Sequence, residues 1–214
     1  MQQWDFCLRD EEVDGIKPST DGWLWPKGDD GLWDGPKQNW SQFKPVIQQH
    51  CRDFKVAVQA GGACGMYPRL LSEMFETVYT FEPSALSFHC LIHNCARERI
   101  VKINAALGES HQMVDVHYGA VSNIGTNTVH PSSSGFVPVL MVDDLDLKQC
   151  DLIMLDIEGY EINALIGARY TMAALKPLVT CENGSTRDIE MFMEEMNYEK
   201  LGVYHADTYW KPRA

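Results

Sequence analysis

The stretch "VAVQAGGACGMYPRLL", Val56–Leu71, decides the fold. It passes from a short apolar run into a cluster of small residues and then into a segment typical of a helix. Small residues leave the backbone open, so a ligand can approach its N–H groups without obstruction by side chains. In an α/β protein such a strand–turn–helix unit lies at the carboxyl edge of a parallel sheet, where ligands bind.

Short apolar runs alternate with helix-like segments after residue 50. The predicted strands are Lys55–Ala60, Thr77–Glu82, Ile100–Leu107, Asp151–Glu158 and Pro177–Glu182. The predicted helices are Tyr67–Glu76, Ser84–Arg97, Tyr160–Met172 and Thr186–Met196. This alternation predicts an α/β fold with a doubly wound, Rossmann-like, mostly parallel sheet. The ending "YEKLGVYHADTYW" predicts two more strands, the last one antiparallel, and a β-rich insert separates the third and fourth parallel strands.

Residues 1–50 are predicted to form an extension packed on a core domain of residues 51–214. The segment "KPSTDGWLWPKGDDGLWDGPKQNW" is dense in Gly, Pro, Asp and Trp, which favours turns and irregular structure. Five of the six tryptophans lie in this extension, at positions 4, 23, 25, 33 and 40. Large aromatic groups gain free energy by packing, so we expect order here, either as a lid over the core or as an aromatic wall for a substrate.

The charge balance is acidic, with a net charge of -12 and a pI of about 4.9. Binding to phosphate backbones or anionic lipid needs clustered Lys and Arg, so we expect no nucleic-acid partner and no membrane partner. Seven cysteines without a C-x-x-C pair indicate reduced thiols. With no export signal and no long apolar run, the sequence predicts a cytoplasmic protein. It leaves the oligomeric state open.

A ligand site is predicted where the first strand meets the first helix of the core. Gly61, Gly62, Ala63 and Gly65 follow the strand directly, and Glu82 ends the next strand about twenty residues later, where a carboxylate can accept both hydroxyls of a ribose. Helix–strand packing alone also explains the small residues. The G-G-A-C-G spacing is not the G-x-G-x-x-G of a dinucleotide site, and no phosphate-binding Lys follows, which favours S-adenosylmethionine over a nicotinamide cofactor.

Three passages resemble those of a known family: "AGGACGMY", "YTFEPSALSFHCLIHN" and "VDDLDLKQCDLIMLDIEGYEINALIGA". On these motifs the chain from about Val56 to Trp210 resembles the class I S-adenosylmethionine-dependent methyltransferases, and within them the FkbM family. The resemblance implies methyl transfer. We expect the acceptor to be an oxygen atom of a small molecule or a sugar.

The resemblance also implies residue roles. The loop of residues 61–65 would hold the methionine moiety, Glu82 the ribose, and residues 104–106 the adenine edge. The complete set of expected cofactor contacts is Gln59, Gly61, Gly62, Ala63, Gly65, Tyr67, Glu82, Pro83, Asn104, Ala105 and Asp156. Gln59 stands where the family usually has Asp, and an uncharged amide weakens that contact by about 1 kcal/mol or more. A degenerate, non-catalytic nucleoside-binding module therefore stays as an alternative, and a nicotinamide-dependent oxidoreductase is a more distant one.

Carboxylates at two strand ends are the candidates for the chemistry. Asp156 and Glu158 end the fourth strand, and Glu182 and Asn183 follow the fifth. The trio Asp156, Glu182 and Asn183 resembles the Mg²⁺ site of catechol-type O-methyltransferases, although strand-terminal acids also cap helices or contact cofactors. His130, in the insert, is a candidate base that needs no metal, although a lone loop histidine is usually a solvated side chain. The predicted catalytic residues are thus Asp156, Glu158 and His130.

Overall fold

A seven-stranded sheet forms the centre of the molecule. The computed structural model describes residues 15–18, 22–29, 34–96, 99–119 and 122–213. The strand order is β12-β13-β11-β10-β3-β4-β5. These strands are β3 (Val56–Ala60), β4 (Thr77–Phe81), β5 (Ile100–Ile103), β10 (Leu152–Leu155), β11 (Leu178–Glu182), β12 (Tyr198–Tyr204) and β13 (Asp207–Pro212). Strands β11, β10, β3, β4 and β5 run parallel, while β13 pairs antiparallel with both neighbours, which confirms the predicted sheet.

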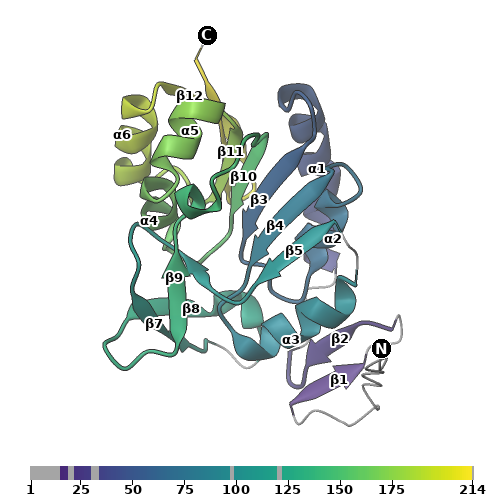
Figure 1. Cartoon of the computed structure of the whole chain (residues 1–214). Coiled ribbons are helices and arrows are strands. Elements are labelled where there is room, and N and C mark those ends of the chain that lie inside the picture. Colours follow the sequence, from purple (N-terminus) through teal and green to yellow (C-terminus); the bar gives the residue numbers. More distant parts are fainter. Residues whose placement is uncertain (1–14, 19–21, 30–33, 97–98, 120–121, 214) are drawn as a thin grey trace, which may run out of the picture.

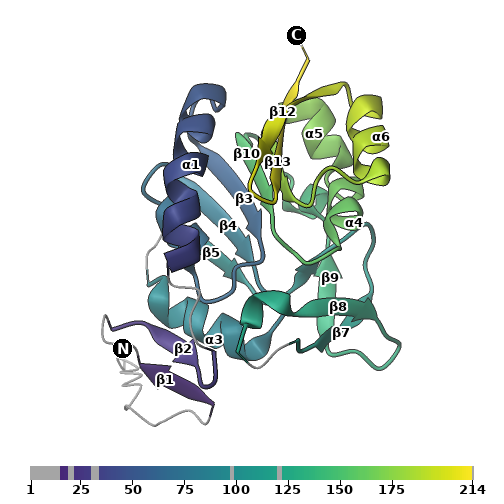
Figure 2. The same cartoon turned by 180° about the vertical axis from the view of Figure 1, so that it is seen from behind.

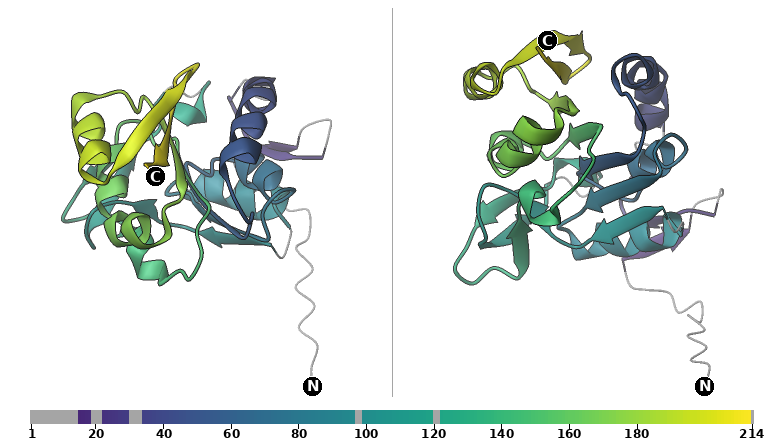
Figure 3. Two further views of the ribbon diagram at one scale, coloured as in Figure 1. Left: turned by 90° about the horizontal axis from the view of Figure 1, so that it is seen from above. Right: turned by 45° about the horizontal axis from the view of Figure 1, so that its top comes forward.

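Helices cover both faces of this sheet. Helices α1 (Asp34–His50) and α2 (Met66–Leu71) lie on one face, and α4 (Glu161–Ile166), α5 (Arg169–Leu175) and α6 (Arg187–Glu195) lie on the other (Figures 2 and 3). Strand β3 places Ala57 in the hydrophobic cluster of the first face and Val58 and Ala60 in that of the second. Because both faces are covered, the strand is apolar except for Gln59 rather than alternating.

The helix α1 contradicts the irregular structure that we expect before residue 50. Trp40, Phe43 and Ile47 are buried in the same cluster, at a spacing of three and four residues. That spacing puts them on one face of a helix, and their packing outweighs the Gly and Pro content that favours turns. The prediction is therefore wrong for Asp34–His50, while the division of the chain near residue 50 stays a prediction. Trp4 and Trp33 lie outside the described residues.

Two further β elements lie beyond the carboxyl ends of the parallel strands (Figure 1). The insert forms a four-stranded sheet of order β6-β9-β7-β8, comprising β6 (Ala106–Leu107), β9 (Val137–Leu140), β7 (Met113–His117) and β8 (Thr128–Pro131), with the short helices η1 (Ile124–Thr126) and η2 (Val142–Leu145). The hairpin of β1 (Ile16–Pro18) and β2 (Leu24–Pro26) packs beside α3 (Ala85–Asn94). The predicted strand Ile100–Leu107 is thus two strands in two sheets.

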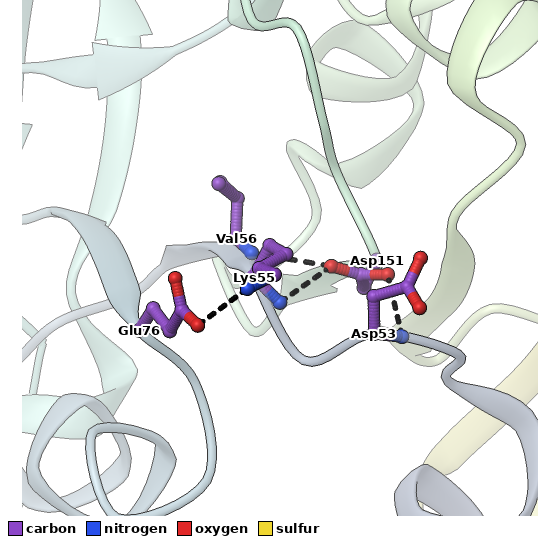
Figure 4. Close-up of polar contacts among 5 residues, drawn as sticks. All are labelled: Asp53, Lys55, Val56, Glu76 and Asp151. Atoms are coloured by element: carbon purple, nitrogen blue, oxygen red, sulfur yellow. Dashed lines mark hydrogen bonds and ion pairs between the residues drawn. The ribbon is translucent and has the colours of Figure 1, made fainter.

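Asp151 fixes the opposite end of β3, where the strand begins (Figure 4). Its carboxylate accepts hydrogen bonds from the backbone N–H groups of Asp53 (3.3 Å), Lys55 (2.8 Å) and Val56 (3.2 Å). The Lys55 ammonium pairs with Glu76 at 2.5 Å, which joins the start of β3 to the segment before β4. These contacts hold the start of β3 to the segments that precede β10 and β4.

The cysteines of the described ranges are buried and free of disulfides. Within the same ranges, no helix combines the length and the apolar character needed to cross a bilayer.

Candidate functional site

A cavity opens at the carboxyl edge of the sheet, where the topology rule places ligands. Its floor consists of the loop after β3, the end of β4, the segment after β5 and the loop after β10. Its roof comes from the hairpin and from the insert, which contribute Trp25, Asp29 and Ile124. Most of the lining is apolar, with a few polar groups that converge on the interior. Such a composition is typical of a site for a small organic ligand.

The loop after β3 needs glycine for packing reasons. Gly61 has a φ of 82°, and a β-carbon on it would overlap the backbone oxygen of Asp156. The N–H groups of Gly61 and Gly62 both donate to the Phe81 carbonyl, at 3.1 and 2.9 Å. Gly65 has a φ of 98°, and its β-carbon would lie 2.5 Å from the Cys95 sulfur. The loop is therefore held tightly, and Gly61, Gly62 and Ala63 line the cavity while Gly65 does not.

Glu82 presents its carboxylate to the cavity beside this loop. Its two oxygens accept the N–H groups of Ala63 and Ser84, each at 2.8 Å. The side chain is only 6% exposed. Burial raises the pKa of Glu82 to about 7, although both hydrogen bonds act in the opposite direction. The carboxylate retains free lone pairs on the cavity side, so it can accept hydroxyl groups of a ligand.

Asn104 supports the same edge from behind. Its Nδ2 donates to the carbonyls of Glu82 (2.7 Å) and Pro83 (3.2 Å), which ties the end of β4 to the end of β5. Pro83 and Ala105 line the cavity, but Asn104 does not. The predicted ribose and adenine contacts therefore lie at the same edge of the cavity. Asn104 holds the backbone around them without lining the cavity itself.

Gln59 lies away from the cavity. The side chain is fully buried; its Nε2 donates to the carbonyls of Ala60 (3.0 Å) and Gly61 (2.9 Å), and its Oε1 accepts the Thr80 hydroxyl at 2.6 Å. An Asp at this position has no N–H with which to hold the Gly61 carbonyl. Gln59 thus braces the glycine loop, and its direct contact with a cofactor stays a prediction.

A group of carboxylates lies at the other end of the cavity. Oxygens of Asp156, Glu158 and Glu182 all lie within 4.8 Å of one another, and Asp156 and Glu158 line the cavity. Burial, followed by repulsion from Glu182 and Asp207, raises the pKa of Asp156 well above its usual range. The Tyr67 side chain also lines the cavity, and burial, with repulsion from Asp156 and neighbouring acids, raises its pKa.

Asp207 belongs to the same group, and sequence reasoning missed it. It is the register partner of Glu182 on the adjacent antiparallel strand and is 7% exposed. Burial and the Glu182 charge raise its pKa to about 7. The predicted hairpin at "HAD" carried the signal, because a last strand beside β11 brings that Asp next to Glu182. Asn183, by contrast, is an exposed residue in a left-handed conformation with a φ of 49°.

His130 is not brought to the cavity. It lies on β8, where Val129 lines the cavity and His130 is exposed to solvent. Its ring packs on that of His117 with 4.3 Å between centroids, and its Nε2 lies 3.1 Å from the Thr128 hydroxyl. Successive side chains of a strand point to opposite faces, which accounts for this placement. A catalytic role for His130 therefore has no geometric support.

The roof of the cavity was not predicted in detail. The Asp29 carboxylate, from the segment after β2, accepts the Ile124 N–H of the insert at 2.8 Å. The Asn94 side chain bonds both the N–H and the carbonyl of Leu24, at 2.8 and 2.9 Å, and donates to the Cys64 carbonyl at 2.8 Å. Trp25 is buried and lines the cavity. This position is consistent both with a lid over the core and with an aromatic wall for a substrate.

Acidic side chains in the passage "VDDLDLKQCDLIMLDIEGYEINALIGA" hold the backbone in place. Asp143 accepts the N–H groups of Tyr170 (3.0 Å) and Thr171 (2.7 Å) at the start of α5. Glu161 accepts the N–H groups of Ile157 and Gly159 at 3.1 and 3.3 Å. These acids position the loop after β10 rather than face the ligand, because a carboxylate satisfies N–H groups that have no helical partner.

Comparisons with known proteins agree with this geometry. The family profile for the methyltransferase FkbM domain matches residues 67–200, which is more than half of the chain. The structure resembles that of methyltransferase FkbM from Methylobacillus flagellatus KT with a TM-score of 0.50 and 20% identity, over 74% of this chain and 43% of that one. It also resembles a putative caffeoyl-CoA O-methyltransferase from Staphylococcus aureus, with a TM-score of 0.51 and 11% identity over 82% and 83% of the two chains.

These structural likenesses show the fold alone. The chain spans less than half the length of the Methylobacillus protein, with 43% of it covered. No curated protein matches the sequence. The matched residues include β4, the Glu82 that follows it and the loop after β10. The chain therefore belongs to the FkbM methyltransferase family.

Proposed function

We propose that this protein is an S-adenosylmethionine-dependent methyltransferase that acts on an oxygen atom of a small molecule or a sugar. The observation that carries the proposal is the placement of Glu82, whose carboxylate lines the cavity beside the glycine loop. Family membership supports the same activity. The absence of a nucleic-acid partner and a cytoplasmic location stay predictions.

The residues of the cavity fit the methyl donor in three places. The Glu82 carboxylate accepts the ribose hydroxyls, as its free lone pairs allow. Phe81, Pro83 and Ala105 provide apolar surface for an adenine ring. The open backbone of the loop at Gly61 admits the methionine moiety. When bound, S-adenosylmethionine supplies a methyl group on a positively charged sulfur.

The acceptor half of the reaction falls to the carboxylates. The methyl donor would supply the CH₃ group and leave as a neutral thioether, and the acceptor hydroxyl would give up its proton to a base of this chain. Glu158 lines the cavity, and burial, with repulsion from Glu182 and Glu161, raises its pKa. A carboxylate with a raised pKa is a stronger base, so Glu158 is the candidate proton acceptor and Asp156 its cavity neighbour.

The test is calorimetric titration of S-adenosylmethionine and S-adenosylhomocysteine into the purified protein, with NAD as a comparison ligand. We expect binding by wild type that Glu82→Ala abolishes, whereas the exposed Glu73→Ala leaves it unchanged. Acceptors are then screened with and without Mg²⁺. No binding of either sulfur compound by wild type contradicts the proposal and favours the degenerate module, and preferential NAD binding favours an oxidoreductase.

A further inference from the structure

We propose that His117 and His130 form a binding site for one zinc ion on the outer face of the insert sheet. The two residues belong to neighbouring strands, β7 and β8, which pair antiparallel (Figures 1 and 2). Both residues are exposed to solvent. The site lies outside the cavity and goes beyond the proposed function, since zinc binding here needs neither a methyl donor nor an acceptor.

The strand register places both imidazole rings on one face of the sheet. His117 lies opposite Thr128, and His130 lies opposite Asp115. Because successive side chains of a strand alternate between the two faces, these four residues share a face. His117 and His130 are therefore diagonal neighbours, at a separation that long side chains can span.

The separation of the two rings suits one shared ion. The centroids of the His117 and His130 rings are 4.3 Å apart, and the ring planes are inclined at 35°. A zinc–nitrogen bond is about 2.0–2.1 Å long, which puts the centroid of a bound imidazole about 3.2 Å from the ion. Two imidazoles at roughly 90–110° around one ion thus have centroids about 4.5–5.2 Å apart. The two rings need to separate by less than about 1 Å, which exposed side chains allow.

The Thr128 hydroxyl orients one of the two rings. Its Oγ1 atom lies 3.1 Å from the Nε2 atom of His130. In the proposed site the hydroxyl accepts the Nε2 hydrogen, so the Nδ1 atom of His130 keeps the lone pair that binds the metal. Metal-binding histidines are commonly held by such a hydrogen bond from the second ring nitrogen.

The donor set favours zinc over the cations that prefer oxygen. Imidazole nitrogens suit zinc, copper and nickel, whereas Mg²⁺ and Ca²⁺ prefer carboxylate and carbonyl oxygens. Zinc has no geometric preference from its d electrons, so it adapts to a pair of exposed side chains. The Asp115 carboxylate, on the same face, adds a negative charge that attracts a cation.

The segment between the two histidines links the site to the cavity. His117 ends β7 and His130 lies in β8, and the chain between them carries η1. Residues of this segment line the roof of the cavity, namely Ile124, Gly125, Asn127 and Val129. An ion bound to both histidines closes the loop that carries them, and loop closure lowers the entropy of its open states. Zinc therefore acts as a clip that stabilises the roof from outside.

Zinc alone, titrated into the full chain by calorimetry, tests the site. We expect a saturable site at which His117→Gln and His130→Gln each weaken zinc binding at least tenfold. His111→Gln is the matched control: it changes another exposed histidine, which pairs with Asp144, and should leave zinc binding unchanged. Glutamine keeps a polar side chain at these exposed positions, and urea unfolding without metal checks that each variant folds.

A second control and a second measurement locate the ion. His89 and His93 are exposed and lie four residues apart on α3, a spacing that also suits chelation, so His89→Gln should leave the proposed site intact. Hydrogen exchange reports the clip, because an ion that binds only the closed loop slows its opening. Zinc should slow exchange of residues 122–129 in wild type and His89→Gln, and should not do so in His117→Gln.

Three results overturn the site: no saturable zinc binding at millimolar concentration, equal binding by wild type and His117→Gln, or binding that only His89→Gln removes. Zinc binding that leaves the exchange of residues 122–129 unchanged refutes the clip. These titrations contain no methyl donor, so their failure is distinct from failure of the proposed function.

Discussion

Glu82→Gln tests the physical state of the carboxyl group on which the proposed function depends. The wild-type carboxyl is buried and accepts two backbone N–H groups at 2.8 Å. Its pKa rises from 4.5 to about 7 in the folded protein, which corresponds to about 3 kcal/mol of folding free energy. Glutamine keeps the shape of the side chain and removes the ionisation.

The direction in which stability changes with pH follows from the direction of the pKa change. A carboxyl whose folded pKa is raised contributes stability that is fully present below the unfolded pKa of 4.5 and is lost as the pH rises through about 7. The glutamine lacks this pH dependence, but its NH₂ group faces one N–H donor, of Ala63 or Ser84, and leaving that donor unsatisfied costs about 1–3 kcal/mol. We therefore expect the variant to be less stable than wild type near pH 4.5 and equally or more stable above pH 7.

Urea unfolding of both proteins across this pH range measures the difference directly. All other titrating groups are common to the two proteins, so the difference in unfolding free energy reports the Glu82 carboxyl. We expect it to change by about 3 kcal/mol between pH 4.5 and pH 8. Parallel curves refute the reasoning, because they mean that burial does not disfavour the charged form. In calorimetry, wild-type affinity for S-adenosylmethionine should rise with pH through 7, and that of the variant should stay low and flat.

Three further changes test the scaffold around the site. Gly61→Ala should lower the unfolding free energy by about 2–5 kcal/mol, because the position has a positive φ and a β-carbon there would overlap the Asp156 carbonyl. Gly159→Ala is the control: its φ is also positive but the space beside it is open, so it should cost about 1–2 kcal/mol. Equal losses of the two variants in urea unfolding contradict the overlap. Asp151→Ala should cost about 2–3 kcal/mol, because three N–H groups lose a charged acceptor, yet calorimetry should show unchanged donor affinity. Gln59→Asp should weaken donor binding by calorimetry, because it frees the Gly61 carbonyl; a large gain in affinity instead indicates a decayed site.

The parallel sheet is predictable from the sequence because each of its strands is a short apolar run between turn or helix signals. The helix α1 escaped prediction because packing of Trp40, Phe43 and Ile47 overrides the local preference of Gly and Pro for turns. The predicted helix Tyr160–Met172 divides at Gly167, where a β-carbon would overlap the Gly108 carbonyl of a distant segment. Contacts between segments far apart in sequence decide these cases, and local patterns do not contain them.

The candidate site shows the same division. The glycine loop and Glu82 can be located because they follow successive strands in the sequence. The full carboxylate group could not be, because Asp207 reaches Glu182 only through the antiparallel pairing of the last strand. His130 shows the limit of placing a residue in the insert from sequence, since its neighbour Val129 lines the cavity while alternation along the strand leaves His130 exposed. Its catalytic role stays a prediction.

The Asn94 side chain gives the site a thermodynamic property of its own. It bonds the hairpin at Leu24 and the glycine loop at Cys64 at the same time. The hairpin and the glycine loop are therefore held together by one side chain, so a change that loosens either segment also removes a contact of the other. Because linkage is reciprocal, a ligand that favours the docked hairpin would also favour the ordered loop, by the same factor in both directions.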